Sequence, residues 1–334
     1  LPLQGCPGQC IFCDQHAQTG QPAQTLETAL AALEQMLDSM RGPFELGFFG
    51  GTFTGLDQSW QARFLDCANT YRHADQLVSI RISTRPDRIS PLLLTWLREQ
   101  GVGLVELGVQ SFTSAVLAQS GRGYSGQEAE NACSQVQRAG LKLGIQLLPG
   151  LPGHTPAQWR NDVQHTLALR PEVVRIYPCV VLAETVLAQW HKHGRFSPWP
   201  LEQAVRECAW AVRQCWEHGI SVIRLGLPGE PSMLERLLAG PWHPAFGSMV
   251  RSRVLRDILT EQLVPEDRVR QLILPVQLQG ELWGHRGEHK NFLAQWGITP
   301  QTVVRTHTNI ITLELENLHA AHTYYQPWLS EKSG

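Results

Sequence analysis

The sequence is short of charged residues, which occupy 17% of its 334 positions, below the ~25% of an average soluble domain. Basic and acidic residues nearly cancel, at a net charge of −2, which excludes a protein that binds nucleic acid through an overall basic surface. No apolar run reaches the ~18–20 residues that span a bilayer, so we expect no membrane association. No signal-peptide pattern opens the chain, and we therefore predict a cytoplasmic protein.

Intrinsic disorder is excluded as well, because the few charges come with 11 Trp and 10 Phe. Hydrophobic residues make up 43% of the chain, which is enough to bury a sizeable core. At roughly 100–200 residues per domain, the length fits one large domain and a smaller one.

The eight cysteines are too sparse for a disulfide scaffold, but three of them fall within eight residues. These three are Cys6, Cys10 and Cys13, and the others are Cys67, Cys133, Cys179, Cys208 and Cys215. Cys133, Cys208 and Cys215 lie in helical patterns, where we expect small buried hydrophobic residues. The closely spaced three need another explanation, because clustered cytosolic thiols usually bind a metal or take part in catalysis.

Helical and strand patterns alternate from about residue 26 to residue 225. Leu26, Leu30, Leu33 and Leu37 recur every three or four residues, which predicts an amphipathic helix. In the same way we predict helices over 26–40, 57–70, 90–99, 126–139, 157–169 and 201–217, and strands over 44–49, 77–83, 103–109, 141–148, 173–178 and 219–225. Strands separated by helices of this length favour parallel βαβ units. We predict a partial (βα)6 or a full β/α barrel, with a doubly wound sheet as the alternative.

One face of the predicted strands is polar. Its residues are Glu45, Ser79, Arg81, Ser83, Arg85, Glu106, Gly108, Gln110, Gly144, Gln146, Arg175, Tyr177 and Arg224. Because helices must cover the apolar face, these side chains are expected to line a solvated or ligand-filled barrel interior. A structural ion-pair cluster, such as Arg81 with Glu106, is the alternative.

The pattern changes after residue 225, where prolines interrupt a loop-rich stretch. We predict helices near 245–259 and 265–273 and strands near 275–283 and 302–315. Residues 226–334 are therefore expected to form a small C-terminal α+β subdomain, and residues 1–225 the barrel.

The spacing Cys6-x3-Cys10-x2-Cys13 places three thiols on one loop that contains Gly and Pro. Structural zinc needs four ligands, for which His16 is the available fourth, and ferredoxin-type clusters use four cysteines. A [4Fe-4S] cluster held by three thiolates leaves one iron open to a small chelating ligand. We favour that cluster, with zinc as the alternative.

The cysteine loop, with Phe12 just before its last cysteine, resembles that of the radical S-adenosylmethionine (SAM) enzymes. The resemblance implies a [4Fe-4S] cluster on Cys6, Cys10 and Cys13, with SAM chelating the open iron. It also implies an external one-electron donor of the flavodoxin or ferredoxin type. One electron then cleaves SAM and yields a 5′-deoxyadenosyl radical that abstracts hydrogen.

The same resemblance implies a set of SAM-binding residues. These are Phe12, Gly50, Gly51, Thr52, Ser83, Arg85, Gln110, Arg122 and Gln146. Five of them have a plain structural alternative: a strand-ending turn for the two glycines, a surface ion pair for Arg85, and structural hydrogen bonds for the two glutamines.

Within the radical SAM enzymes, three stretches resemble the elongator catalytic subunit and, more distantly, the coproporphyrinogen dehydrogenases. They are 49–55, 81–87 and 174–178, and the resemblance covers about residues 1–230. The elongator subunit also has a C-terminal acetyltransferase domain, which the ~100 remaining residues are too few to supply. Against the family pattern, the chain begins inside the first strand of the barrel, so we expect that strand to be truncated.

Arg81, Arg175 and Arg224 on the polar face suit a substrate that carries a carboxylate or phosphate, with Tyr177 beside them. A packed salt-bridge network with Glu45 and Glu106 is the alternative. We therefore predict a radical SAM enzyme that abstracts hydrogen from an anionic small molecule or nucleotide. The alternatives are a tRNA-modifying enzyme, which the charge does not indicate, and a non-catalytic iron–sulfur or zinc module.

Overall fold

The computed structural model describes residues 1, 4–6, 10–14, 25–72, 76–261, 263–308, 310–316 and 321–325. They form two compact units, Leu1–Pro200 with Gly226–Trp242 and Leu201–Leu225 with His243–Gly334. The units interleave along the chain, and the predicted boundary at residue 226 stays a proposal. None of the helices in these ranges is long and apolar enough to cross a membrane.

A six-stranded sheet of order β1-β2-β3-β4-β5-β7 carries the barrel. Its strands are β1 (Phe44–Phe48), β2 (Leu77–Thr84), β3 (Val102–Gln110), β4 (Lys142–Leu147), β5 (Val173–Ile176) and β7 (Ser221–Leu225). The pairs from β1 to β5 are parallel. The strand order follows the chain order without the reversal of a doubly wound sheet, which confirms the predicted partial barrel.

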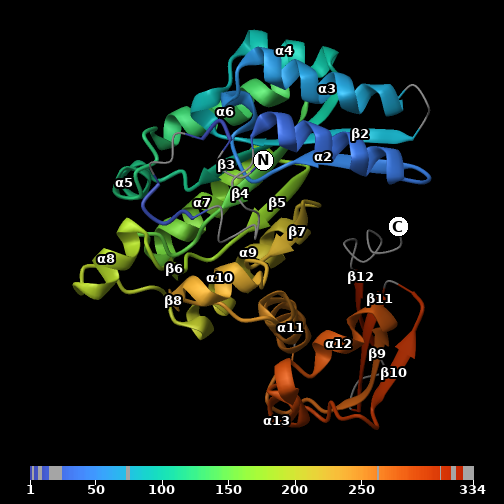
Figure 1. Ribbon diagram of the computed structural model, residues 1–334. Helices are drawn as coiled ribbons and strands as arrows, with labels where there is room; N and C mark the ends of the chain where they lie inside the picture. The colour runs from blue at the N-terminus through green and yellow to red at the C-terminus, as the bar shows by residue number, and fades with distance from the viewer. Residues whose placement is uncertain are drawn as a thin grey trace. The chain divides into compact units, whose positions relative to one another are not determined.

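Helices alternate with these strands. They are α2 (Leu26–Ser39), α3 (Gln58–Arg72), α4 (Pro91–Glu99), α6 (Gly126–Arg138), α7 (Pro156–Leu169) and α9 (Leu201–Glu217). Figure 1 shows α3, α4 and α6 gathered on one side of β2, β3 and β4. Side-chain caps fix where several begin: Thr25 accepts a hydrogen bond from the Thr28 amide, and Thr155 does so from Gln158 ahead of Pro156.

The two faces of the strands differ as predicted. In β1, Phe44, Leu46 and Phe48 are buried whereas Glu45 is exposed, because successive side chains point to opposite faces of a strand. In β2, Ile80 and Ile82 are buried while Arg81 and Ser83 are half-buried. The apolar parity therefore packs beneath the helices, and the polar parity remains for a site.

Short elements lie in the connections between these strands and helices. They are α5 (Ser114–Gln119), β6 (Val181–Leu182), α8 (Val186–Lys192), α10 (Pro231–Arg236), β8 (Leu237–Ala239) and the 3-10 turns η1 (Phe53–Gly55) and η2 (Pro86–Arg88). The sequence did not predict them, because segments of two to seven residues are too short to show a hydrophobic period.

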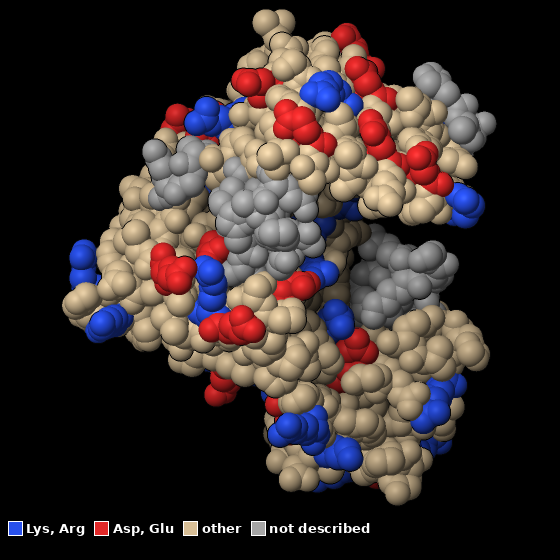
Figure 2. All heavy atoms as spheres, in the orientation of Figure 1, with Lys and Arg blue, Asp and Glu red and all other residues tan. Residues whose placement is uncertain are grey.

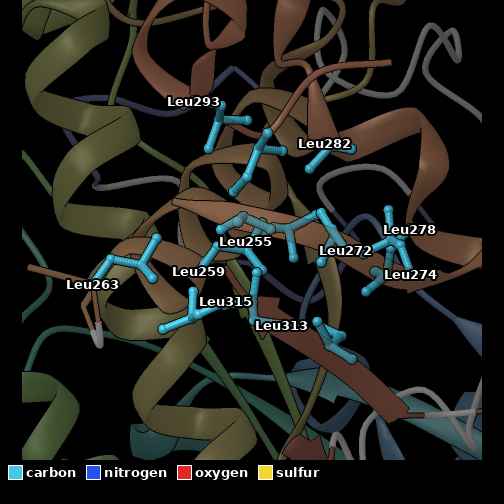
Figure 3. Close-up of a cluster of buried hydrophobic side chains, with 13 residues drawn as sticks. Leu255, Leu259, Leu263, Leu272, Leu274, Leu278, Leu282, Leu293, Leu313 and Leu315 are labelled. Carbon is cyan, nitrogen blue, oxygen red and sulfur yellow. The ribbon is translucent and has the colours of Figure 1, made fainter. Parts of the chain in front are cut away.

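The second unit has its own core. Its remaining elements are α11 (Phe246–Thr260), β9 (Val269–Pro275), η3 (Val276–Leu278), α12 (Gln279–Leu282), η4 (His285–Gly287), α13 (Lys290–Ala294), β10 (Val303–Thr306), β11 (Ile310–Leu315) and β12 (Ala321–Tyr325). The four strands form a sheet of order β10-β9-β11-β12. Leucines of α11, β9 and β11 meet in a buried cluster (Figure 3) that includes Leu255, Leu272 and Leu313. This composition confirms the predicted small α+β fold.

Two predicted elements of this unit are wrong. The helix predicted near 265–273 contains most of β9, because Val269 and Leu272 mimic a helical spacing whereas β9 in fact pairs with both β10 and β11. The strand predicted near 275–283 is η3 and α12, in which Leu278 and Leu282, four residues apart, enter the core together. The stretch 302–315 is two strands on opposite sides of β9.

The isolated cysteines behave as predicted. Cys133, Cys208 and Cys215 are buried within helices α6 and α9. Burial raises the pKa of Cys133, Cys179 and Cys215 to about 12, so these thiols stay protonated at neutral pH.

Candidate functional site

The cysteine loop is held between two short helices. The Ile11 amide donates to the Ser120 carbonyl at the end of α5, at 3.3 Å, and the Leu187 amide at the start of α8 donates to the Ile11 carbonyl, at 2.9 Å. Phe12 is buried in an apolar cluster against which Cys10 and Cys13 pack. These contacts fix the loop from both sides and place Cys10 and Cys13 against an apolar surface.

The three thiols lie close enough to influence one another. Burial, followed by the negative charges of Cys10 and Cys6, raises the pKa of Cys13 to about 12, against the opposing effect of Arg122. Among the described residues, no group of three His, Cys, Asp or Glu side chains could hold a single metal ion. His16 lies outside the described residues. Three thiols on one loop, with a cation beside them, fit the donor set of a [4Fe-4S] cluster, in which each thiolate binds its own iron.

Two buried arginines point at Cys10. Nη1 of Arg122 lies 3.1 Å from the Cys10 Sγ, and Nη1 of Arg85 lies 3.5 Å from the same atom. Arg85 also pairs with Asp87 through Nε, at 2.8 Å. The ion pair that was the alternative for Arg85 therefore exists, but Arg85 itself is buried and faces the cysteine loop.

The Gly50–Thr52 turn packs against the residues that precede Cys6. The Thr52 amide donates to the Gln4 carbonyl at 2.9 Å. A Cβ on Gly51 would lie 2.4 Å from that same carbonyl oxygen, so only glycine fits there. The turn thus lies beside the residues that precede Cys6, and its predicted role toward SAM stays a prediction.

The two predicted glutamines meet at the carboxyl ends of β3 and β4. Nε2 of Gln146 donates to Oε1 of Gln110 at 3.3 Å. Gln110 is buried and has φ of 69°, a left-handed conformation that costs of order 1–3 kcal/mol for a residue other than glycine and is concentrated at functional sites. The structural hydrogen bond is therefore present, and a cofactor role for the pair, or for half-buried Ser83, stays a prediction.

A cluster of charged side chains lies on the polar face of strands β2, β3 and β5. Glu106 is almost fully buried and accepts from Nη2 of Arg81 at 2.6 Å and from Nη2 of Arg175 at 3.3 Å. Arg175 also donates to the Tyr177 hydroxyl at 3.2 Å, and its guanidinium lies 4.9 Å from the centre of the Phe49 ring. Burial alone would lower the pKa of Arg175, but its hydrogen bond to Glu106 raises it, so the guanidinium stays charged.

The salt-bridge network that was the alternative for these arginines is thus formed, mainly through Glu106. Glu45 adds a weaker contact to Arg81, at 3.8 Å, from an exposed position. Nε of Arg81 is buried without a hydrogen-bond partner among the described residues. Arg224 is exposed and belongs to the second unit, so its predicted place in this cluster stays a prediction.

Two family models together match most of the chain. The radical SAM superfamily matches residues 1–165, and the radical SAM C-terminal domain matches residues 171–256. The chain belongs to the radical SAM superfamily. This membership confirms the fold and the class of enzyme predicted from the sequence.

Similar curated proteins include tRNA uridine(34) acetyltransferases and heme chaperones. The tRNA uridine(34) acetyltransferase of Methanocaldococcus infernus is 29% identical over 252 residues, 62% of this chain and 47% of that protein. The heme chaperone HemW of Synechocystis sp. is 25% identical over 242 residues, 67% of this chain and 58% of that protein. The chain spans about half the length of the curated relatives that it matches.

Solved radical SAM structures agree on the fold. The archaeal Methanocaldococcus infernus Elp3 with an N-terminal deletion is similar at a TM-score of 0.59 and 25% identity, over 70% of this chain and 59% of that one. Coproporphyrinogen III oxidase (HemN) from Escherichia coli, at a TM-score of 0.50 and 22% identity, covers 66% of this chain and 51% of that one and shows the fold alone.

Sequence reasoning missed two residues of this radical SAM site. Tyr124 accepts a hydrogen bond from Nε of Arg122 at 2.8 Å, and its place two residues after Arg122 could have signalled it. Arg236 forms an ion pair with Asp14, directly after Cys13, across a separation of 222 residues. No pattern in the sequence links positions so far apart.

Proposed function

We propose that the chain binds a [4Fe-4S] cluster through Cys6, Cys10 and Cys13, binds SAM beside it, and acts on an anionic small molecule or nucleotide. The observation that carries this proposal is the convergence of three thiols and two guanidinium groups on one loop of a radical SAM chain. When bound, the cluster supplies the electron that cleaves SAM to a 5′-deoxyadenosyl radical for hydrogen abstraction. That electron comes from a cytoplasmic donor of the flavodoxin or ferredoxin type.

The protein groups around the loop have three tasks. The thiolates hold the cluster, and Arg85 and Arg122 offset their negative charge, which would otherwise be costly to bury. The apolar cluster around Phe12 excludes water from one side of the loop. For SAM we propose contacts from Gly50, Gly51, Thr52, Ser83, Arg85, Gln110, Arg122 and Gln146, with Phe12 behind the loop.

The anionic substrate is proposed from the charge balance at Glu106. Two guanidinium groups share this one buried carboxylate, and no described residue accepts a hydrogen bond from Nε of Arg81. A carboxylate or phosphate placed against Arg81 and Arg175 would supply it through charge-assisted hydrogen bonds. The Phe49 ring and the Tyr177 hydroxyl beside Arg175 add an aromatic surface and a polar contact, which suit a nucleotide.

The experiment measures 5′-deoxyadenosine from reduced, reconstituted protein. Bulk tRNA, nucleoside monophosphates and small dicarboxylates are added one at a time, and a substrate is a compound that accelerates the reaction. Arg175→Ala should then remove most of the acceleration and spare the slow cleavage without substrate. The matched control is Lys142→Ala, which removes an exposed charge paired with Glu172. If both rates fell together in Arg175→Ala, Arg175 would belong to the SAM site or the scaffold.

tRNA modification is the second candidate, favoured by the relatives named as tRNA uridine(34) acetyltransferases. Figure 2 shows Lys and Arg interspersed with Asp and Glu over the face drawn, and the net charge is −2. A tRNA substrate would thus be bound through local contacts. Acceleration by tRNA alone supports this candidate, and acceleration by a small anion alone contradicts it.

A further inference from the structure

The Sγ of Cys10 receives guanidinium N–H groups from two arginines that come from different parts of the barrel. Arg85 follows β2, and Arg122 lies in the loop between α5 and α6. Their Nη1 atoms lie 3.5 and 3.1 Å from the Cys10 Sγ. Both side chains are buried, so neither bond competes with bulk water.

Arg122 is held in place by the groups around it. Its Nε donates to the Tyr124 hydroxyl at 2.8 Å, and its Nη2 donates to the Gly108 carbonyl. Burial raises the pKa of Tyr124 to about 12, so the hydroxyl keeps its proton and donates it to the same Gly108 carbonyl, at 2.8 Å. The remaining side of the guanidinium is thereby aimed at Cys10.

Arg85 is fixed in a similar way. Asp87 accepts from its Nε at 2.8 Å and from its Nη2 at 3.1 Å, and the Arg122 carbonyl accepts from Nη2 at 2.6 Å. The carboxylate of Asp87 offsets part of the Arg85 charge, whereas Arg122 has no carboxylate partner among its described contacts. Arg122 is therefore the stronger positive charge at Cys10.

The three cysteines differ in this respect. Neither Cys6 nor Cys13 has a side-chain hydrogen bond to a described residue, whereas Cys10 has two. Hydrogen bonds to a ligating sulfur and nearby positive charge are established levers on the potential of an iron–sulfur cluster. In this arrangement Cys10 is the proposed ligand that receives both the hydrogen bonds and the positive charge.

We propose that Arg122, assisted by Arg85, is a positioning residue that raises the reduction potential of the cluster through N–H···S hydrogen bonds to Cys10. The inference rests on the proposed ligation by Cys6, Cys10 and Cys13. One-electron reduction by the external donor adds a negative charge to the cluster and its thiolates, so a fixed positive charge at Cys10 favours the reduced state. The effect brings the cluster within reach of a weaker reductant.

This role differs from SAM binding, which the family resemblance implies for Arg122. A residue that only binds SAM leaves the potential of the SAM-free cluster unchanged when it is replaced. A residue that donates to Cys10 changes that potential before SAM is added. The SAM-free measurement therefore separates the two.

The experiment is a redox titration of the reconstituted full chain without SAM, followed by the EPR signal of the reduced cluster. In Arg122→Gln we expect the ratio of reduced to oxidised cluster at a fixed potential to fall at least tenfold, about 59 mV for a one-electron couple. Arg85→Gln should shift it in the same direction by less, and Arg122→Lys should recover part of the loss. Arg88→Gln, which removes a half-exposed guanidinium 3.9 Å from Asp87, is the control and should not shift it.

Two results overturn the inference in distinguishable ways. An unchanged potential in Arg122→Gln, with full iron content, contradicts the role of Arg122 and leaves the proposed cluster in place. Wild-type protein that assembles no cluster contradicts the proposed function itself. If Arg122→Gln does not retain the cluster, the potential of Arg85→Gln decides in its place, with the same expected sign.

Discussion

Arg85 has few free hydrogen-bond donors, and this determines what it can offer SAM. Asp87, the Arg122 carbonyl and the Cys10 thiol take most of its N–H groups. Nη1 of Arg85, which donates one N–H to Cys10, has a second N–H with no acceptor among the described residues. A carboxylate bound there gains one hydrogen bond to a charged group, in a buried setting.

We therefore expect Arg85→Ala to weaken SAM binding about tenfold or more, since a hydrogen bond to a charged group contributes roughly 1.5–3 kcal/mol. Equilibrium dialysis of SAM against the reconstituted protein measures this. The iron content should stay normal, and Arg88→Ala is the matched control. Unchanged SAM affinity in Arg85→Ala would contradict a contact between Arg85 and SAM, and Arg85 would then serve only through its contacts to Asp87 and Cys10.

At the residue scale, the sequence predicted which side chains gather but not how they pair. Arg81 and Glu106 were expected on one face of the strands, and parity placed them there correctly. Parity did not predict that Glu106 would take both Arg81 and Arg175, because that depends on side-chain reach across neighbouring strands. The contact of Arg122 with Cys10, 112 residues away, lay outside any local pattern.

Helix α6 follows directly on the Arg122 loop, and its first turn is a capping box. The Glu128 carboxylate accepts from the Ser125 amide and from the Ser125 hydroxyl, both at 2.7 Å. The hydrogen bond from the amide, followed by that from the hydroxyl, lowers the pKa of Glu128. A lowered pKa in the folded state means that the ionised carboxylate stabilises the fold.

This stabilisation is present above the unfolded pKa of Glu, near ~4.3, and is lost as the pH falls through the lower folded value. We expect Glu128→Gln to be less stable than wild type at pH 7, with the difference shrinking as the solution is acidified. Urea unfolding at several pH values measures it, with Glu34→Gln at an exposed position of α2 as the control. A difference that does not change with pH would contradict the role of the ionised carboxylate.

At the element scale, prediction succeeded where a strand or helix follows its own hydrophobic period. The predicted 201–217 coincides with α9, and 126–139 differs from α6 by a single residue. Prediction failed at β9, where Val269 and Leu272 carry a helix-like spacing but pairing with two neighbouring strands decides the outcome. Tertiary pairing of this kind overrides local pattern, and a single sequence does not display it.

The whole molecule contains more than one core. The barrel strands bury residues such as Leu107, and the second unit has the separate leucine cluster of Figure 3. Stability is therefore expected to be set locally in each unit.

Leu272→Ala removes a fully buried side chain from the second cluster and should cost about 2–5 kcal/mol. In a urea titration, the part of the tryptophan fluorescence change that comes from Trp283 and Trp296, which pack against this leucine cluster, should move to lower urea, while the iron–sulfur absorbance keeps its wild-type midpoint. Leu107→Ala, equally buried but in β3, should instead lower the urea concentration at which the iron–sulfur absorbance is lost. If both signals moved together in Leu272→Ala, the two units would unfold as one.

The central claim, that three cysteines hold a cluster with an iron open to SAM, is tested most directly by EPR of the reduced, anaerobically reconstituted protein before and after adding SAM. We predict that the wild-type EPR signal changes when SAM is added. Iron analysis of the same samples should give about four irons per chain in wild type and in Cys133→Ala, and little or none in Cys10→Ala. Normal iron content in Cys10→Ala, or a wild-type signal that SAM leaves unchanged, would contradict the account.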